Sequence, residues 1–234
     1  MKAMILAAGL GTRLKPFTDH HPKALAIVNG KSLLQRNIEY LQDYGIYEVV
    51  VNVHHFANQM KDAIQKNKGW GSNVTISDES EEVLETGGGL LRAKAHFENE
   101  AKWLVMNADI LTNLDLGKML EADKAFDASS EGEMVATLAV TNRTTSRNLI
   151  FNTAGTLCGW KNNTTNEEKW ANPLKNPAMA VPKAFSGIQI VHANFFEALS
   201  LHGKFSLIDA YLQIAQHYAI HFYDHSDGIL LDVG

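Results

Sequence analysis

The sequence predicts an α/β protein with a mainly parallel central sheet, helices on both faces and a small antiparallel insertion. In the first half of the chain, short apolar runs bounded by turn residues alternate with longer segments of helical period, which is typical of β-α units. The first apolar run ends in a glycine-rich turn, where such folds commonly bind ligands. In the middle of the chain, successive apolar runs follow one another without helices between them, which indicates antiparallel strands.

The first half of the chain accounts for the parallel part of the sheet. Strands are expected over four apolar runs, at residues 3–8, 48–53, 73–77 and 103–106. Helices are expected between them, at residues 32–44, 57–67 and 84–97. In the first of these helices Leu34, Ile38 and Leu41 fall on one face, and Gly45 suits its C-terminal end.

The second half is expected to hold the antiparallel insertion and to complete the fold. Strands are predicted at residues 134–140, 148–152, 157–160, 187–191, 220–223 and 228–231, and a helix at 207–216. Residues 162–182 are polar and contain Pro173, Pro177 and Pro182, so we expect a loop there, over the surface or over a cleft. Because neither half contains an internal repeat or a linker, residues 1–234 are expected to form one domain.

Composition argues against several classes of protein. The 234 residues are 45% hydrophobic with a net charge of −5, so general nucleic-acid binding, which depends on Lys and Arg, is not expected. No apolar stretch approaches the roughly 20 residues of a membrane-spanning helix, and the N-terminal run stops too early for a signal peptide. The single cysteine, Cys158, favours a reducing compartment, so a cytoplasmic location is expected.

The glycine-rich turn after the first strand has the sequence G-L-G-T-R, from Gly9 to Arg13. Glycine lets the backbone approach phosphate closely and adopt positive φ, and successive N–H groups can bind an anion. A dinucleotide fingerprint would need glycine where Leu14 stands, and a Walker A loop would need glycine where Leu25 stands. Both motifs are therefore excluded, and by itself the turn could be an ordinary β-α connection.

Together with Pro22-Lys23, this turn resembles the G-x-G-T-R…P-K signature of sugar-nucleotide pyrophosphorylases, which join a nucleoside triphosphate to a sugar 1-phosphate. The resemblance implies a Rossmann-like nucleotidyltransferase fold, with nucleotide binding in about residues 1–115 and sugar binding in about 116–234. It implies catalytic roles for Arg13 and Lys23, since cations hold the leaving pyrophosphate and neutralise the transition state. The implied nucleotide contacts are Leu6, Ala7, Ala8, Gly9, Gly11, Thr12, Arg13 and Lys23.

A second glycine cluster, L-E-T-G-G-G from Leu84 to Gly89, opens the third expected helix. By itself it is typical of a helix N-terminus with a flexible entry. Many family members carry L-G-T-A-G-A here, and the form in this chain is similar to that of bacterial N-acetylmuramate 1-phosphate uridylyltransferases, which serve cell-wall recycling. The resemblance implies that Gly88 contacts the base and that Glu85 lies on the substrate side. The acidic side chains just before the cluster are expected to form a solvated edge: Glu79, Glu81 and Glu82.

Two aspartates are candidate metal ligands. Asp109 follows the apolar run at 103–106 and resembles the metal aspartate of the family's N-G-D motif, while Asp232 resembles that of the closing W-x-D-V-G motif. Mg²⁺ prefers oxygen ligands and commonly binds one or two carboxylates plus phosphate oxygens. The resemblance therefore implies Mg²⁺ as the cofactor, with Asp109 also catalytic. A helix N-cap for Asp109 and a turn for Asp232 are the structural alternatives.

The remaining implied contacts concern the sugar. They are Asn107, beside the first aspartate, and Ser186 and Gly187 in the segment F-S-G-I-Q. Asn148 joins them because it occupies the place of an S-R-x-L-L-F segment in the same subgroup. The family's E-K-P sugar-site motif is absent, and the nearest pair, Pro182-Lys183, has the reverse order.

The implied reaction is an in-line attack by the sugar 1-phosphate oxygen on the α-phosphorus of UTP, which expels pyrophosphate. N-acetylmuramate 1-phosphate is the expected acceptor. A mannose 1-phosphate guanylyltransferase stays open, because the glycine clusters use mostly backbone groups, and so does a non-catalytic nucleotide-sugar sensor. Family members continue past D-V-G with a P-E-R-L-like segment and a closing helix, so a chain that stops at Gly234 is expected to be a truncated form. The sequence leaves monomer and homodimer open.

Overall fold

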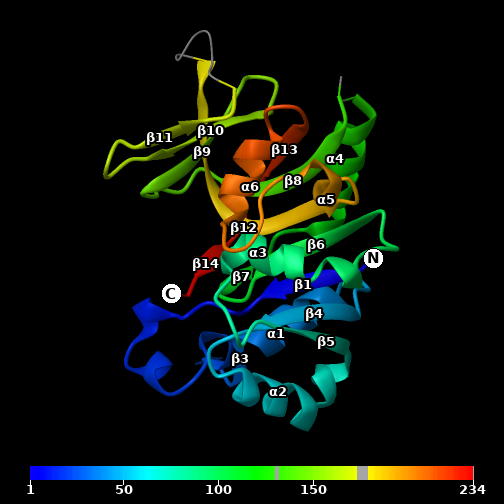
Figure 1. Cartoon of the computed structure of the whole chain (residues 1–234), viewed down its shortest axis with the longest axis vertical. Helices are drawn as coiled ribbons and strands as arrows, with labels where there is room; N and C mark the ends of the chain where they lie inside the picture. Colours follow the sequence, from blue (N-terminus) through cyan, green and yellow to red (C-terminus); the bar gives the residue numbers. More distant parts are fainter. Residues whose placement is uncertain (130–131, 173–178, 234) are drawn as a thin grey trace.

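The computed structural model describes residues 1–129, 132–172 and 179–233, and its centre is a ten-stranded sheet (Figure 1). Eight strands follow the order β11-β10-β9-β12-β6-β1-β4-β5, and β8 and β13 continue from β12. The central strands β1, β4, β5 and β6 run parallel, as predicted, whereas β12 is antiparallel to β6, so the sheet as a whole is mixed. The strands are β1 Ala3–Leu6, β4 Glu48–Val53, β5 Asn73–Asp78, β6 Lys102–Asn107, β8 Met134–Thr141, β9 Arg147–Phe151, β10 Leu157–Asn162, β11 Glu168–Trp170, β12 Val181–His192 and β13 Ala219–Asp224.

Strands β1, β4 and β6 are buried on both faces of the sheet, since their successive side chains point to opposite faces and nearly all of them are buried. On β1, Ala3 and Ile5 belong to one hydrophobic cluster, and Met4 and Leu6 belong to the other. The side chains of β4 and β6 divide between the same two clusters. A sheet covered on both faces requires strands that are apolar throughout, which is the pattern of these runs in the sequence.

Helices cover the two faces as predicted. The side chains of α1, α2 and α4 pack in one cluster, and those of α3, α5 and α6 pack in the other (Figure 1). Helix α1 begins where the sequence predicts, because the Ser32 hydroxyl accepts a hydrogen bond from the Gln35 N–H at 3.1 Å. Among the described residues, no helix has the length and apolar character needed to cross a membrane. The helices are α1 Leu33–Gln42, α2 Ala57–Lys66, α3 Glu85–Arg92, α4 Leu116–Ser129, α5 Phe195–Ala198 and α6 Leu207–Ile214.

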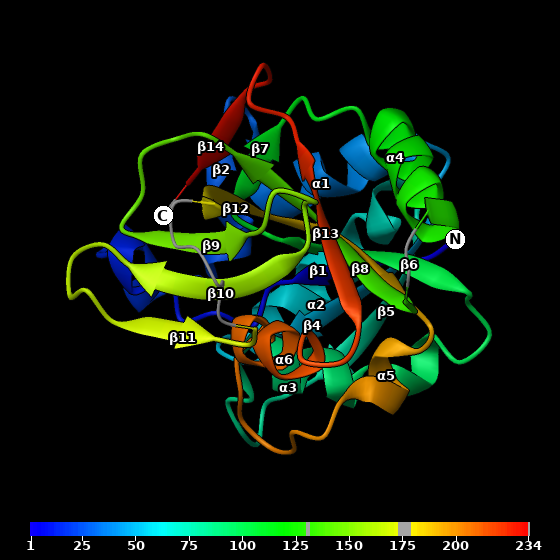
Figure 2. The ribbon, with the colours of Figure 1, turned by 90° about the horizontal axis from the view of Figure 1, so that it is seen from above.

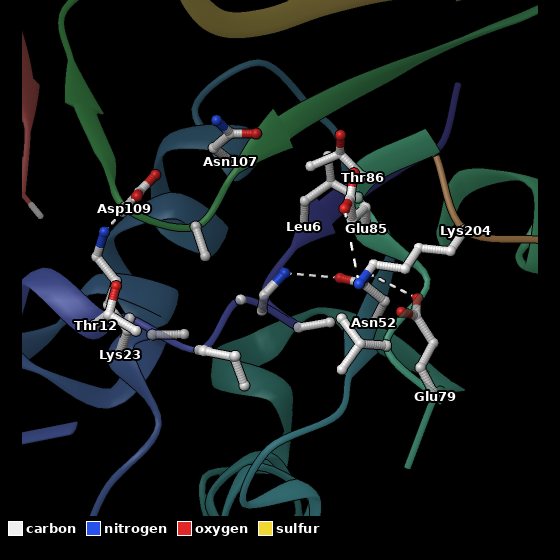
Figure 3. A pocket seen from close by; sticks show the side chains of 18 residues that line it. Leu6, Thr12, Lys23, Asn52, Glu79, Glu85, Thr86, Asn107, Asp109 and Lys204 are labelled. Carbon is white, nitrogen blue, oxygen red and sulfur yellow. Dashed lines mark hydrogen bonds and ion pairs between the residues drawn. The ribbon is translucent and has the colours of Figure 1, made fainter. Parts of the chain in front are cut away.

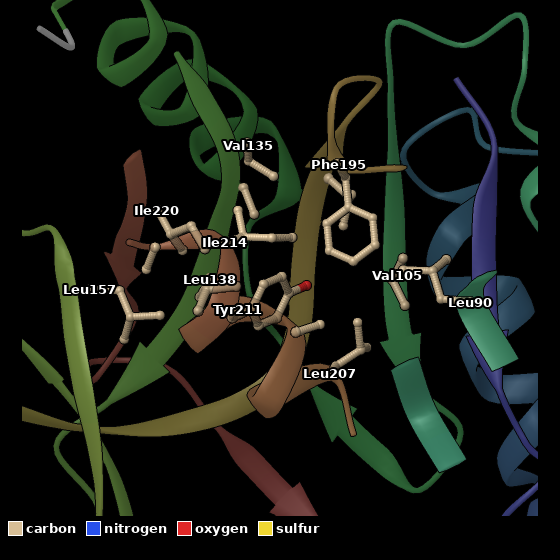
Figure 4. Packing of buried hydrophobic residues seen from close by; sticks show 14 of the residues in the cluster. Leu90, Val105, Val135, Leu138, Leu157, Phe195, Leu207, Tyr211, Ile214 and Ile220 are labelled. Atoms are coloured by element: carbon tan, nitrogen blue, oxygen red, sulfur yellow. The ribbon is translucent and has the colours of Figure 1, made fainter. Parts of the chain in front are cut away.

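The antiparallel part is organised around β12, which pairs with β6, β8 and β9 and so joins the two halves of the chain. Figure 2 shows β9, β10 and β11 side by side at one end of the sheet. Helix α6 packs against this region through Tyr211, which is fully buried and lies among Leu138, Leu207 and Ile214 (Figure 4). The ring of Tyr211 meets that of Phe195 edge-on, with centroids 6.0 Å apart.

Short elements complete the fold. Strand β14, Leu230–Asp232, pairs with β7, Ile110–Thr112, so the last predicted strand forms a separate two-stranded sheet. A second small sheet joins β2, Ile27–Val28, to β3, Lys31–Ser32. The 3-10 turns are η1 Thr12–Leu14, η2 Phe17–Asp19, η3 Lys23–Leu25, η4 Lys68–Gly71 and η5 Lys94–His96.

Two predicted segments differ from the structure. The helix expected over 84–97 ends at Arg92, and the 3-10 turn η5 follows it. The loop expected over 162–182 contains the short edge strand β11, and β12 already begins at Val181. Pro173 and Pro177, which suggested that loop, lie outside the described residues.

Helix α4 was missed by the sequence analysis because a charged residue stands on its buried face. Leu116, Met119 and Asp123 all point inward, and Asp123 is fully buried. Its carboxylate accepts hydrogen bonds from Lys102 Nζ at 2.8 Å and from His192 Nε2 at 2.9 Å. Thr137 Oγ1 donates a third at 2.8 Å. Burial alone would raise the pKa of Asp123, but the hydrogen bonds from His192 and Lys102 outweigh it and lower the pKa below its usual value.

This network predicts that Asp123→Asn destabilises the protein at neutral pH. The substitution removes a buried anion that forms an ion pair with Lys102 and accepts a hydrogen bond from His192, and breaking a buried ion pair costs about 3–5 kcal/mol. Because the native pKa of Asp123 is lowered, its contribution is present above the unfolded pKa and is lost as the pH falls through the native value. Urea unfolding should therefore show a larger loss at pH 7 than at pH 3. Asp127→Asn, an exposed partner 3.8 Å from Lys102, is the control and should change little. An equal effect of both variants would contradict the prediction.

Candidate active site

A cavity of about 470 Å³ opens at the carboxyl ends of the parallel strands (Figure 3). Strand β1 leads into the glycine-rich turn on its wall, and β4, β5 and β6 contribute their last residues or those that follow. Helix α3 and a segment from the second half of the chain close it. The lining residues are Leu6, Ala7, Ala8, Gly9, Leu10, Gly11, Thr12, Lys23, Ala24, Asn52, Glu79, Val83, Glu85, Thr86, Asn107, Ala108, Asp109 and Lys204.

The glycine-rich turn needs glycine at position 11 for two reasons. Gly11 has a φ of +63°, in the left-handed region. A Cβ atom there would also lie 2.9 Å from the Lys23 Cβ and 2.8 Å from the Thr18 Cγ2. The Thr18 hydroxyl donates to the Gly11 carbonyl at 2.8 Å and holds the turn against this neighbour. The close packing places Lys23 beside the turn, as the spacing of the motif suggested.

At this end of the cavity, Lys23 and Asp109 form a close ion pair, with 2.5 Å between Nζ and Oδ2. Lys23 comes from the loop after the glycine turn and Asp109 follows β6, so residues distant in sequence meet at the edge of the sheet. Both side chains are mostly shielded from solvent, at 12% and 21% exposed. The pair concentrates an ammonium and a carboxylate beside free backbone groups of the turn, an arrangement that can bind phosphate and a cation.

Arg13 and Asp232 lie next to this pair but do not line the cavity. Their side chains approach to 3.8 Å, and that of Arg13 is 67% exposed. The Val233 N–H donates to the Asp109 carbonyl at 2.9 Å, so pairing of β14 with β7 brings the second aspartate beside the first. The structural alternatives for the two aspartates do not hold, because neither caps a helix and Asp232 lies in a strand.

The opposite end of the cavity is built on Asn52, at the end of β4. Its Oδ1 accepts from the Ala7 N–H at 2.7 Å, and its Nδ2 donates to Glu79 Oε1 at 2.8 Å. Glu79 is 1% exposed, so the expected solvated acidic edge is wrong at this position, although Glu81 and Glu82 are exposed. Burial raises the pKa of Glu79, and its Oε2 has no hydrogen-bond partner among the described residues.

The three glycines of the second cluster each face a different neighbour. A Cβ on Gly87 would lie 2.5 Å from the Phe205 ring, and one on Gly88 would lie 2.3 Å from the Gly203 carbonyl oxygen. A Cβ on Gly89 would lie 2.6 Å from Glu79 Oε1. The N–H groups of Gly87 and Gly88 both donate to the Phe205 carbonyl, at 3.0 and 3.2 Å. The structure therefore gives Gly88 a packing role beside the cavity, and its implied contact with a base stays a prediction.

The implied sugar-side residues are only partly brought together. Asn107 lines the cavity, and Gly187, with a φ of +73°, leaves room for its side chain, because a Cβ there would lie 2.7 Å from Asn107 Nδ2. Ser186 is buried and hydrogen-bonded to His225 Nε2 at 2.8 Å. Asn148 lies in β9 and accepts from Asn163 Nδ2 at 2.5 Å. Asn148 and Ser186 are therefore engaged with the protein and do not line the cavity.

Comparison with known families agrees with this geometry. Residues 2–148 match the family described as nucleotidyl transferase. The chain belongs to this family. The sequence resemblance is thereby confirmed, and the glycine turn, Lys23, Asp109 and the second glycine cluster all fall within the matched part.

Individual relatives of this nucleotidyl transferase carry more specific names. An N-acetylmuramate alpha-1-phosphate uridylyltransferase of Neisseria meningitidis is 40% identical over 115 residues, or 49% of each chain. A mannose-1-phosphate guanyltransferase of Candida glabrata is 30% identical over 138 residues, 58% of this chain and 38% of the relative. The matched part thus spans about half or less of these relatives. The crystal structure of HddC from Yersinia pseudotuberculosis, complexed with GMP-PN, superposes with a TM-score of 0.74 at 23% identity, covering 99% of this chain and 93% of that one, and shares the fold.

Several lining residues of this nucleotidyl transferase escaped the sequence analysis. Asn52 gave a usable signal, because it interrupts the valines of an otherwise apolar strand. Thr86 lies within the second glycine cluster but was given no role, and Glu79 precedes that cluster without a pattern of its own. Lys204 gave none, since it lies in a loop more than a hundred residues away from the second glycine cluster that it approaches.

The packing of the second cluster predicts that Gly88→Ala is destabilising. The added methyl group meets a backbone oxygen that cannot rotate away, and such overpacking typically costs about 1–3 kcal/mol. Gly132→Ala is the control, since a Cβ there meets no heavy atom of the described residues within 4 Å. Urea midpoints should fall for the first variant and stay near the parent value for the second. An unchanged midpoint for Gly88→Ala would show that residues 203–206 are not held as described.

The buried carboxyl group predicts a pH-dependent gain from Glu79→Gln. The native pKa of Glu79 is raised, so its favourable contribution is present at low pH and is lost as the pH rises towards the native pKa. The melting temperature of the variant relative to the parent should therefore increase as the pH rises above about 4.5. Exposed Glu81→Gln should show no such trend. A difference that is constant over pH 4–8 would contradict the burial of an ionisable group.

Proposed function

We propose that this chain transfers a uridylyl group from UTP to N-acetylmuramate 1-phosphate and releases pyrophosphate, a reaction suited to cytoplasmic recycling of cell-wall sugars. The observation that carries the proposal is the Lys23–Asp109 pair on a glycine-lined cavity in a member of the nucleotidyl transferase family. The Neisseria relative, 40% identical, bears the name of this activity. The part of this chain that matches the family, residues 2–148, contains both glycine clusters and both members of the pair.

In this proposal the chain acts by positioning and electrostatics. The attacking group is a phosphate oxygen, already anionic, so a general base has little to contribute. Backbone N–H groups of the glycine turn bind the triphosphate, and Lys23 is placed to neutralise charge that develops at the α-phosphorus. Arg13 stands outside the cavity wall, where an extended side chain can meet the outer phosphates. Asn107, held beside Gly187, faces the acceptor.

The family resemblance also implies Mg²⁺, and the residues present fit it. Among the described residues, no group of three or more His, Cys, Asp or Glu side chains could hold a metal ion by itself. Asp109 and Asp232 nevertheless stand on adjacent backbones and offer hard oxygen ligands, and Mg²⁺ commonly takes one or two carboxylates with phosphate oxygens completing the shell. These two residues would hold the ion, which when bound supplies charge neutralisation at the phosphates.

A guanylyltransferase is the second candidate, because a mannose-1-phosphate guanyltransferase is also related at 30% identity. In this proposal the nucleobase lies at the end of the cavity formed by Asn52 and Glu79, which we call the base end, and the contacts there fit either nucleotide. The carboxyl group of Glu79 can accept from a ring N–H, and both uracil and guanine carry one beside a keto oxygen.

The first experiment is pyrophosphate release with Mg²⁺, each of the four nucleoside triphosphates, and a panel of sugar 1-phosphates. The panel contains the N-acetylmuramate, N-acetylglucosamine, glucose and mannose compounds. Release with UTP and N-acetylmuramate 1-phosphate alone supports the proposal. Release with GTP and mannose 1-phosphate replaces it by the second candidate. No release from a folded protein that still binds a nucleotide would overturn both and favour a non-catalytic sensor.

We predict that Lys23→Ala lowers turnover by roughly 10²–10³-fold, the usual effect of losing a group that stabilises transition-state charge. Folding stability should fall by about 1–3 kcal/mol, since the variant leaves the mostly shielded Asp109 carboxylate without this partner, an effect smaller than the loss of turnover. The control is Lys15→Ala, whose exposed ammonium lies 3.2 Å from Asp19. A normal rate in a folded Lys23→Ala protein would remove Lys23 from the mechanism.

A further inference from the structure

Lys204 is the residue of the second half that lines the base end of the cavity. It belongs to residues 203–206, which we call the strap, between α5 and α6. Figure 3 shows its side chain extending towards Glu85, in the region of Asn52 and Glu79. Lys23 and Asp109, which mark the phosphate end, lie on the far side of the same view. Lys204 is therefore a cation away from the phosphates, where the nucleoside would lie.

The strap is held in place by backbone contacts to α3. The Phe205 carbonyl accepts from Gly87 and Gly88, and the Phe205 N–H donates to the Leu84 carbonyl at 3.2 Å. Just beyond the strap, the Leu207 N–H donates to Thr86 Oγ1 at 2.9 Å. These hydrogen bonds fix the strap against the second glycine cluster. The glycines of that cluster leave room for the strap, because side chains at their positions would collide with it.

The side chain of Lys204, by contrast, has only a weak partner. Its Nζ lies 3.9 Å from Glu85 Oε1, and the two side chains are 54% and 47% exposed. Exposed ion pairs of this kind hold a side chain only loosely. At the same end of the cavity, the buried Glu79 Oε2 has no hydrogen-bond partner among the described residues. A mobile donor and an unused acceptor therefore share one end of the site.

We propose that Lys204 donates a hydrogen bond to the keto oxygen of the nucleobase, beside Glu79, and so selects keto bases over amino bases. This rests on the proposed function only in that the cavity binds a nucleoside triphosphate. A lysine ammonium donates and cannot accept, whereas the unpartnered oxygen of Glu79, Oε2, can accept. Uracil and guanine present a keto oxygen next to a ring N–H, which complements this pair. Cytosine and adenine present an amino group next to a ring acceptor, so both contacts are mismatched.

The test measures binding of UTP, GTP, CTP and ATP by calorimetry without a sugar phosphate. The parent protein should bind UTP or GTP roughly ten- to hundred-fold more tightly than CTP and ATP, the usual effect of leaving buried polar groups unpaired. Lys204→Met keeps the length of the side chain and removes its donors, so the preference should fall by roughly ten-fold or more. Lys204→Arg should retain much of it. Lys169→Met, which removes a lysine from a comparable exposed pair with Asp209, should leave it intact.

A second variant separates base contact from an indirect effect. If Lys204 acts only by holding Glu85, Glu85→Gln should reproduce the loss of preference, and that result would overturn the proposal. In the expected result, Glu85→Gln leaves the preference unchanged or increases it, because the lysine is released. Equal weakening of all four nucleotides by Lys204→Met would assign it to ribose or phosphate and would also overturn the proposal.

The binding data are independent of catalysis. A parent protein that prefers UTP and GTP but releases no pyrophosphate would refute the proposed function and leave the role of Lys204 standing. Release of pyrophosphate by a protein that binds all four nucleotides equally would refute the role of Lys204 and leave the proposed transfer reaction standing.

Discussion

The cavity depends on the hydrogen bonds of Asn52, a polar residue at the end of a buried strand. Through the Ala7 N–H this side chain fixes the start of the glycine turn, and through Glu79 Oε1 it fixes the segment that leads to α3. One side-chain amide therefore holds two walls of the cavity in place, the glycine turn through its oxygen and Glu79 through its nitrogen. A valine at this position would fit the apolar pattern of β4 but would leave two buried polar groups without partners.

The second constraint is the close approach of the two halves of the chain. The three consecutive glycines allow the strap, Glu79 and Asn52 to pack directly against α3, so the second half supplies Lys204 to a cavity formed mostly by the first. At the other end, the pairing of β14 with β7 brings Asp232 next to Asp109. Each end of the site thus combines residues from both halves of the chain. The two halves are held together by one continuous sheet, in which β12 joins them.

Much of this arrangement could be predicted from local patterns. Apolar runs located the central strands, and the capping residue Ser32 located the start of α1. The motifs located half of the residues that line the cavity, from Leu6 to Thr12 together with Lys23 and Asp109. Helix α4 was missed because Asp123 breaks its apolar face, and its partners Lys102, Thr137 and His192 come from other strands. Glu79 was expected to be exposed for a similar reason. Its burial depends on contacts with Asn52 and with Gly89 of α3, and these are not visible in the local sequence.

The sequence by itself determined the α/β class, the order of the central strands along the chain and the two glycine clusters, because these follow from periodicity and from residues whose backbone freedom is local. Only the tertiary structure decided what the clusters are for. It showed Gly11 making room for Lys23, and Gly88 making room for the strap. It also decided which charges meet, as Lys23 with Asp109 and Lys204 with Glu85. Such contacts join residues up to 119 positions apart. Which residues meet is decided by the packing of whole helices and strands, and this cannot be predicted from a local sequence pattern.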